Sequence, residues 1–118
     1  MTELEKLVGR LRRFSKVRDW EQFHTPKNLA MALAGEVGEL LAELQWLTPE
    51  ESSKIMEDPE SAARLESEVA DVMIYLTRLA DALKIDLLKA AHAKLDESER
   101  RYPVEAYRGS ARKAPPLV

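Results

Sequence analysis

The chain has 118 residues, the length of one domain, and carries 18 Lys and Arg against 21 Asp and Glu, for a net charge of −3. This balance argues against a nucleic-acid-binding protein, which needs a strongly basic surface. The lack of cysteine excludes disulfide scaffolds, zinc–thiolate sites, iron–sulfur clusters and thiol nucleophiles, and two histidines are too few for a histidine-rich metal site. Any chemistry must come from carboxylates, basic groups, hydroxyls and a few aromatic rings.

Neither a targeting signal nor a membrane span is expected. The first six residues include the charged Glu3, Glu5 and Lys6 and lack the apolar run of a signal peptide. No apolar stretch approaches the ~20 residues that cross a bilayer. We therefore expect a cytoplasmic protein that contacts no membrane.

Apolar residues recur at helical spacing in four segments, which begin near residues 4, 26, 59 and 86. The second segment runs to about residue 47, the third to about 84, and the fourth stops at Tyr102-Pro103. A short helical turn is expected over 49–56, and no alternating pattern predicts a strand. The sequence predicts an all-α fold of the four-helix-bundle type with short loops.

Helix starts are marked by capping residues. Thr25, Thr48 and Asp58 each precede a proline, as an N-cap precedes proline at the first helical position. Thr2 and Thr48 are each followed three residues later by glutamate, the pattern of a capping box.

The C-terminal end differs in charge from the rest. Residues 100–118 carry five basic residues against one acidic residue. We expect a helical domain over residues 1–103 and a basic, flexible tail over residues 104–118.

Two acidic pairs lie in the middle of predicted helices: Glu36 with Glu39, and Glu68 with Asp71. Spacing of i, i+3 places both carboxylates of a pair on one helix face. If the two helices pack antiparallel, the four carboxylates converge and need a compensating charge. Oxygen ligands suit Mg²⁺ or Mn²⁺, and protein-bound Mg²⁺ commonly holds a phosphate.

The alternative is that these are ordinary surface charges, since Glu-x-x-Glu is common on helices. Gly35 and Gly38 argue against it, because each costs roughly 1 kcal/mol in mid-helix relative to alanine. Close helix–helix approach would explain them. Glu43, one heptad after Glu36, either extends the acidic face or is a solvated rim charge, and Glu66 is a surface residue.

Aromatic and basic residues could complete such a site. Rings near it could stack on a flat base, or could be core residues or hydrophobic staples. His24 could equally be a hydrogen-bonding residue of the loop, and Lys94 a phosphate contact or a solvated helix charge. The rings are Trp20, Phe23, His24, Trp46 and Tyr75.

These motifs together resemble one family, the MazG-like nucleoside triphosphate pyrophosphohydrolases, and within it the dCTP pyrophosphatase branch. The resemblance spans about residues 10–113. It is carried by Arg18-Asp19-Trp20-Glu21-Gln22-Phe23-His24, Asn28-Leu29-Ala30, Gly35-Glu36-Val37-Gly38-Glu39-Leu40, Gln45-Trp46, Glu68-x-x-Asp71-Val72, Tyr75-Leu76, Lys94, Arg101-Tyr102-Pro103 and Arg108-Gly109-Ser110-Ala111-Arg112-Lys113. Two positions depart from that branch: Leu11 stands where some members have histidine, and Ser98 where many have asparagine.

The resemblance implies an all-α bundle whose site is completed in a homodimer or homotetramer. It implies Mg²⁺-dependent hydrolysis of a (deoxy)nucleoside triphosphate, dCTP or a modified dCTP, to the monophosphate and pyrophosphate. The residues it assigns are the metal ligands Glu36, Glu39, Glu68 and Asp71, the base and sugar contacts Trp20, His24, Trp46 and Tyr75, and the phosphate contacts Lys94, Ser98 and Arg112.

The mechanism expected from these residues uses a metal-bound water that attacks in line, with Glu36 or Glu39 accepting its proton. The segment Gly109–Lys113 could close over the phosphates. Three alternatives stay open at this point: a phosphoribosyl-ATP-type or broad-specificity pyrophosphatase, a ferritin-like di-iron protein, and a non-catalytic helical interaction module. The di-iron reading is weak, because neither acidic pair ends in histidine.

Overall fold

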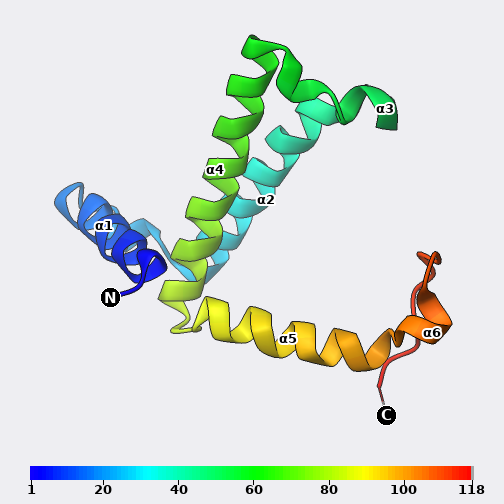
Figure 1. Cartoon of the computed structure of the whole chain (residues 1–118). Coiled ribbons are helices and arrows are strands. Elements are labelled where there is room, and N and C mark those ends of the chain that lie inside the picture. The colour runs from blue at the N-terminus through cyan, green and yellow to red at the C-terminus, as the bar shows by residue number, and fades with distance from the viewer. Residues whose placement is uncertain (118) are drawn as a thin grey trace. The chain divides into compact units, whose positions relative to one another are not determined.

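The computed structural model describes residues 1–117, and every regular element in that range is a helix (Figure 1). The predicted all-α class is thus confirmed. The chain divides into two compact units, one from Met1 to Lys84 and one from Ile85 onward. Each unit is described by itself below.

The first unit begins with α1 (Glu3–Val17), closed by a capping box between Thr2 and Glu5. Two hydrogen bonds from the Arg12 guanidinium to the Asp81 carboxylate link α1 to the last turn of α4 (Pro59–Ala82). A single 3₁₀ turn, η1 (Glu21–Phe23), then leads to α2; the sequence patterns did not predict this turn.

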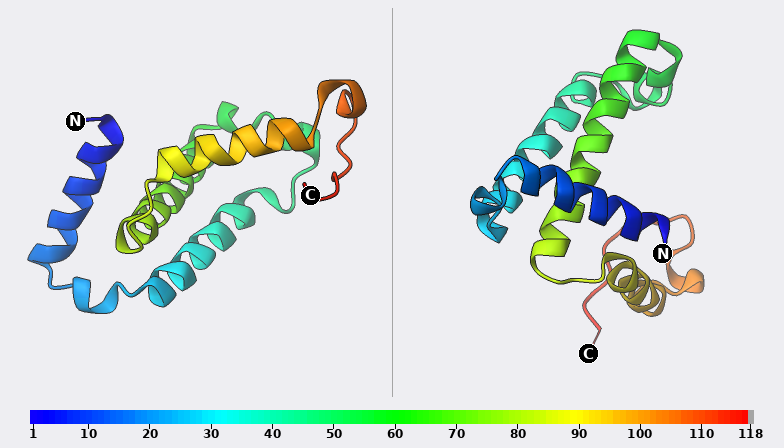
Figure 2. Two further views of the ribbon diagram at one scale, coloured as in Figure 1. Left: turned by 90° about the horizontal axis from the view of Figure 1, so that it is seen from below. Right: turned by 90° about the vertical axis from the view of Figure 1, so that its left-hand side faces the viewer.

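Helices α2 (Pro26–Leu44) and α4 make the most extensive helix–helix contact of the unit. They lie side by side and run in opposite directions, as Figures 1 and 2 show. Between them, α3 (Pro49–Ser52) and η2 (Ile55–Glu57) form the expected short helical segment. The predicted N-caps are confirmed, because Thr25, Thr48 and Asp58 each accept a hydrogen bond from a backbone N–H three residues later.

The helix pair buries little apolar surface within its own chain. Leu29 and Ala80 are the buried apolar residues of this unit. Much of both predicted apolar stripes instead stays exposed, for example Leu41 at 56% and Val69 at 51%. Within residues 1–117, a large part of the apolar face of α2 and α4 is therefore exposed.

The two glycines of α2 do not mark a close approach within the chain. A Cβ placed on Gly35 or Gly38 would meet nothing within 4 Å among the described residues. Close helix–helix approach at these positions stays a prediction: within residues 1–117 both lie on an open side of α2, where alanine would fit and favour the helix more.

The second unit contains α5 (Leu87–Arg101) and the short α6 (Val104–Tyr107). The segment after α6 has no regular structure up to residue 117, yet it contacts α5. Arg101 donates to the carbonyl oxygens of Ala114 and Pro115, and the backbone N–H of Ala114 donates to the Tyr102 hydroxyl. The division expected at residue 103 stays a prediction, and the division into compact units falls at residue 84.

No helix within residues 1–117 combines the length and the apolar character that crossing a bilayer requires.

Candidate functional site

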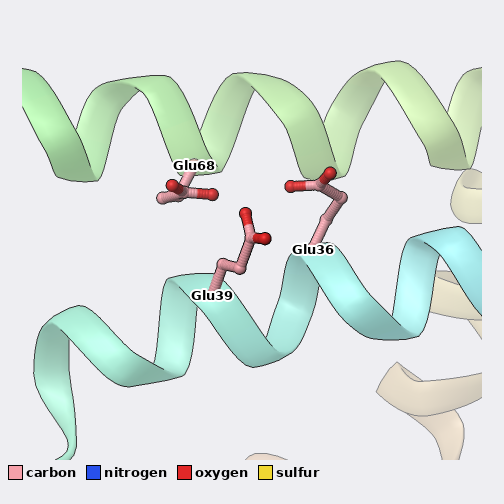
Figure 3. A group of neighbouring side chains, drawn as sticks. All are labelled: Glu36, Glu39 and Glu68. Atoms are coloured by element: carbon pink, nitrogen blue, oxygen red, sulfur yellow. The ribbon is translucent and has the colours of Figure 1, made fainter.

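Three glutamates meet between α2 and α4. Glu36 and Glu39 project from α2 toward α4, and Glu68 projects from α4 toward α2 (Figure 3). One carboxylate oxygen from each of the three lies within 4.8 Å of the others. The antiparallel packing of two mid-helix acidic pairs, expected from the sequence, produces this convergence.

The cluster concentrates negative charge without a built-in counterion. The Oε2 atoms of Glu36 and Glu68 are buried and have no hydrogen-bond partner in residues 1–117, and no basic side chain in that range forms an ion pair with any of the three glutamates. Burial, followed by the charges of Glu39 and Asp71, raises the pKa of Glu36 above its usual value. Burial, followed by the neighbouring carboxylate of Glu39, does the same to the pKa of Glu68.

Such a site can hold a hard divalent cation. Orphaned carboxylate oxygens are the atoms that a cation would bind, and an all-oxygen set with no histidine or cysteine suits Mg²⁺ or Mn²⁺. The absence of histidine from the cluster also disagrees with a ferritin-like di-iron site.

Asp71 lies one helical turn after Glu68 but is not one of the three converging carboxylates. Its charge nevertheless contributes to the raised pKa of both Glu36 and Glu68, so it lies in their immediate field. Its assignment as the fourth ligand stays a prediction.

Glu43 and Glu66 lie at the margins of the cluster. Glu43 accepts a hydrogen bond from Arg64 at 3.2 Å, so its charge already has a partner. Glu66 is exposed, as the sequence analysis expected. Glu66 is a useful reference position, because it shares α4 with Glu68 but is not among the charges that raise the pKa of Glu36 or Glu68. The charge of Glu43, in contrast, contributes to the raised pKa of Glu68.

A cavity of about 450 Å³ opens beside the cluster, and Asp71 lies in its wall. Three of the four residues expected at a base or sugar line it: Trp20, His24 and Tyr75. The other lining residues are Leu7, Arg10, Leu11, Phe14, Ser15, Ile74 and Arg78. Its volume is in the range of small-molecule pockets, and aromatic rings together with a few polar groups are the usual lining of such a pocket.

Rings in this wall pack edge to face. The Phe14 and Trp20 centroids are 5.6 Å apart, and those of Trp20 and His24 are 6.4 Å apart. Trp20 is 43% exposed, so its position is fixed by these neighbours while part of its surface stays free to contact a ligand.

The fourth expected aromatic residue, Trp46, lies just beyond the C-terminus of α2 and does not line the cavity. It is 86% exposed, an unusual state for so large an apolar ring. A role for Trp46 in base binding stays a prediction.

The three expected phosphate contacts belong to the second unit. Lys94 and Ser98 are both on α5, and the Lys94 ammonium lies 3.4 Å from Glu97. Arg112 stacks over the Tyr107 ring at 4.8 Å and donates to the Ala106 carbonyl. Their assignment to phosphate stays a prediction.

Arg10, Ser15 and Arg78 are the polar residues of the cavity that the sequence patterns did not single out. Asp71, Tyr75 and Arg78 follow the i, i+4, i+7 spacing of one helix face, so the acidic pair and the tyrosine could have pointed to Arg78. Apolar residues of the predicted stripe lie on both sides of Arg78 in the sequence, so the pattern gave no reason to single it out.

Comparison with known proteins supports the resemblance inferred from the motifs. A family model described as the MazG-like family matches residues 32–115. Among solved structures, the crystal structure of a pyrophosphatase from Archaeoglobus fulgidus DSM 4304 matches with a TM-score of 0.80 and 38% identity, covering 87% of this chain and 94% of that chain.

Curated relatives match over a shorter part of their own length. The dCTP pyrophosphatase 1 of Bos taurus is 48% identical over 98 residues, which cover 83% of this chain and 58% of the relative. The dCTP pyrophosphatase 1 of Homo sapiens is 47% identical over 100 residues, covering 85% and 59%. The matched part of this chain thus spans about three fifths of the length of these relatives.

Proposed function

Since the chain belongs to the MazG-like family, we propose that it hydrolyses a (deoxy)nucleoside triphosphate to the monophosphate and pyrophosphate. The proposed substrate is dCTP or a base-modified dCTP, because the bovine and human relatives at 48% and 47% identity are named for that nucleotide. The observation that carries the proposal is the juxtaposition of a carboxylate cluster with a ring-lined cavity, with Asp71 beside both.

We assign the cluster to Mg²⁺, with Mn²⁺ as a substitute. Glu36, Glu39, Glu68 and Asp71 would hold the ion, and the buried unpartnered oxygens of Glu36 and Glu68 support this assignment. When bound, the ion supplies charge neutralisation for the triphosphate and a lowered pKa for a bound water.

The protein's own groups perform the remaining tasks. Glu36 or Glu39 accepts the proton of the attacking water, because histidine is absent from the cluster. Trp20, His24 and Tyr75 receive the base and sugar in the cavity, which orients the phosphates relative to the carboxylates. Lys94, Ser98 and Arg112 are the proposed phosphate contacts.

The working molecule is proposed to be a homodimer or homotetramer. The uncovered apolar face of the first unit, which includes Val37 and Met73 at 46% and 49% exposure, supports self-association. The open sides of Gly35 and Gly38 leave room for another backbone to approach α2, which nothing in the described part of this chain does. Trp46 could acquire its contact with the base in such an assembly.

The test is pyrophosphate release in the presence of Mg²⁺. Glu39→Gln and Asp71→Asn should each nearly abolish release while the helical circular dichroism spectrum is retained. Glu66→Gln, an exposed neighbour on the same helix as Asp71, is the matched control and should keep full activity. Full activity in the Glu39→Gln or the Asp71→Asn variant would refute the assignment of that residue to the metal site.

A panel of canonical and base-modified nucleotides decides the substrate. Highest kcat/KM for dCTP or a modified dCTP supports the proposal. Preference for phosphoribosyl-ATP, or equal rates with all nucleotides, would replace the substrate assignment and leave the reaction class in place. No Mg²⁺ binding by calorimetry together with no hydrolysis would favour a non-catalytic helical interaction module.

A further inference from the structure

Arg78 is a buried arginine in the wall of the cavity, with 8% of its surface exposed. Its two terminal nitrogens face different partners. One lies 3.3 Å from Nδ1 of His24, and the other lies 3.5 Å from a carboxylate oxygen of Asp81. Its Nε atom is buried without a hydrogen-bond partner in residues 1–117. A buried guanidinium with an unused donor is unfavourable for folding, so its retention needs another reason.

The contact with His24 dictates where the imidazole carries its proton. A guanidinium is always protonated and has only donors, so Nδ1 of His24 must be the acceptor. A neutral ring that accepts at Nδ1 carries its hydrogen on Nε2. The second ring nitrogen is thereby made a donor.

Arg78 is itself fixed from the opposite side. Asp81 accepts one hydrogen bond from Nε and one from Nη2 of Arg12, so the carboxylate that faces Arg78 is anchored to α1. The resulting series runs from Arg12 through Asp81 and Arg78 to His24. It ends at the ring in the cavity wall.

The surroundings of His24 keep the ring neutral. Burial, followed by the positive charge of Arg78, lowers the pKa of His24 below its usual value, and the opposing effect of Glu21 is smaller. The bond with Arg78 is the one side-chain hydrogen bond of this ring among residues 1–117. The donor on Nε2 is thus left for whatever occupies the cavity.

We infer that Arg78 is a positioning residue that holds His24 as the Nε2–H tautomer, so that His24 presents a hydrogen-bond donor to an acceptor atom on the nucleobase. The inference rests on the proposed function, because it takes a nucleobase as the occupant. A pyrimidine with an unprotonated N3, as in cytosine, offers the matching acceptor. Uracil carries a hydrogen on N3, so two donors would face each other there and no hydrogen bond would form.

The tautomer can be measured without any substrate. In ¹⁵N-labelled protein, a protonated ring nitrogen and an unprotonated one resonate far apart. The chain has only two histidines, and the second, His92, belongs to the other unit, so it serves as an internal reference. His24 should show a protonated Nε2 and an unprotonated Nδ1. Arg78→Met should shift His24 toward a mixture of tautomers and leave His92 unchanged, and an unchanged His24 spectrum in a folded Arg78→Met protein would overturn the inference.

Kinetics then link the tautomer to recognition. Arg78→Met should raise KM for dCTP about tenfold with a smaller change in kcat, the effect of one lost hydrogen bond to a bound base. The ratio of kcat/KM for dCTP to kcat/KM for dUTP should also fall in this variant. Arg78→Lys keeps a hydrogen-bond donor, so it should restore part of the wild-type KM for dCTP and part of the discrimination against dUTP. Arg13→Met, which removes an exposed arginine from α1, is the control and should match the wild type.

A second pair of variants avoids dependence on the fold around Arg78. In His24→Gln the amide nitrogen can replace the Nε2 donor, whereas in His24→Asn it cannot reach as far. The glutamine variant should therefore discriminate dCTP from dUTP better than the asparagine variant. Equal discrimination by the two variants would contradict the inference. A wild-type protein that hydrolyses no nucleotide would instead refute the proposed function, and the tautomer measurement would still be decisive for Arg78.

Discussion

Replacing Glu36 with glutamine should stabilise the metal-free protein and weaken its response to Mg²⁺. Its carboxylate lies within 4.8 Å of those of Glu39 and Glu68. Two unit charges at that separation repel by about 1 kcal/mol even in water, and by more where the surroundings are drier. Removing the charge of Glu36 should therefore raise the free energy of unfolding by about 1–2 kcal/mol. The new amide can in addition donate a hydrogen bond to a neighbouring carboxylate.

The sign should reverse when the metal is present. A ligand that binds only the folded state stabilises it by about 2.7 kcal/mol at one hundred times its dissociation constant. The wild-type cluster should gain this increment from Mg²⁺, while the Glu36→Gln cluster lacks one charged ligand and should gain much less. Thermal unfolding in EDTA should thus place the variant several degrees above the wild type, and saturating Mg²⁺ should reverse the order.

Glu66→Gln is the appropriate control, since its charge is exposed and outside the cluster. The Glu66→Gln variant should have nearly the same thermal unfolding midpoint as the wild type, both in EDTA and in saturating Mg²⁺. All midpoints must be compared at one protein concentration, because self-association also contributes to stability. If Glu36→Gln is less stable than the wild type in EDTA, or gains as much from Mg²⁺, the carboxylates are not a repulsive cation site and the reasoning fails.

Two further predictions concern stability. The hydrogen bonds and charge of Arg12 hold the pKa of Asp81 below its usual value, so the stability that this carboxylate contributes is present above its unfolded-state pKa near 3.9 and is lost as the pH falls through the lower folded value. The Asp81→Asn variant should accordingly have a lower free energy of unfolding than the wild type at neutral pH, and that free energy should fall less when the pH is lowered. Parallel acid-unfolding curves for the variant and the wild type would contradict this. The Thr77 hydroxyl is buried without a partner in residues 1–117, so Thr77→Val should leave the unfolding free energy unchanged or raise it by up to about 1 kcal/mol; a loss beyond that, measured in urea, would show that the hydroxyl has a partner.

The elements of the fold were predictable because their signals are local. Thr25, Thr48 and Asp58 mark helix starts through hydrogen bonds that span three residues, and the structure contains each of those bonds. The 3₁₀ turn η1 was not predictable from periodicity, because three residues are too few to show a helical repeat. The small helix α6 was missed for the same reason.

Convergence of Glu36, Glu39 and Glu68 was predictable from spacing alone, provided that the two helices run antiparallel. The role of Arg78 was not, because it depends on a contact with His24 across 54 positions of sequence. The surface that explains the two glycines was not predictable for a related reason. Sequence shows that a helix carries an unfavourable residue but does not show which surface compensates for it, and in this chain no described residue does.

The basic residues of α4 explain why the cluster keeps its charge. Arg64 lies one turn before Glu68 and is engaged by Glu43, while Arg78 lies two turns after Asp71 and is engaged by Asp81 and His24. Both guanidiniums are close along the helix, yet each is held by a different partner and neither neutralises the central carboxylates. Loss of the charge on Glu43 or Asp81 would free an arginine to turn inward and compete with a cation. The outer acidic residues therefore occupy the positive charge of α4, and the three glutamates of the cluster have no basic partner within residues 1–117, which is the state that a cation site requires.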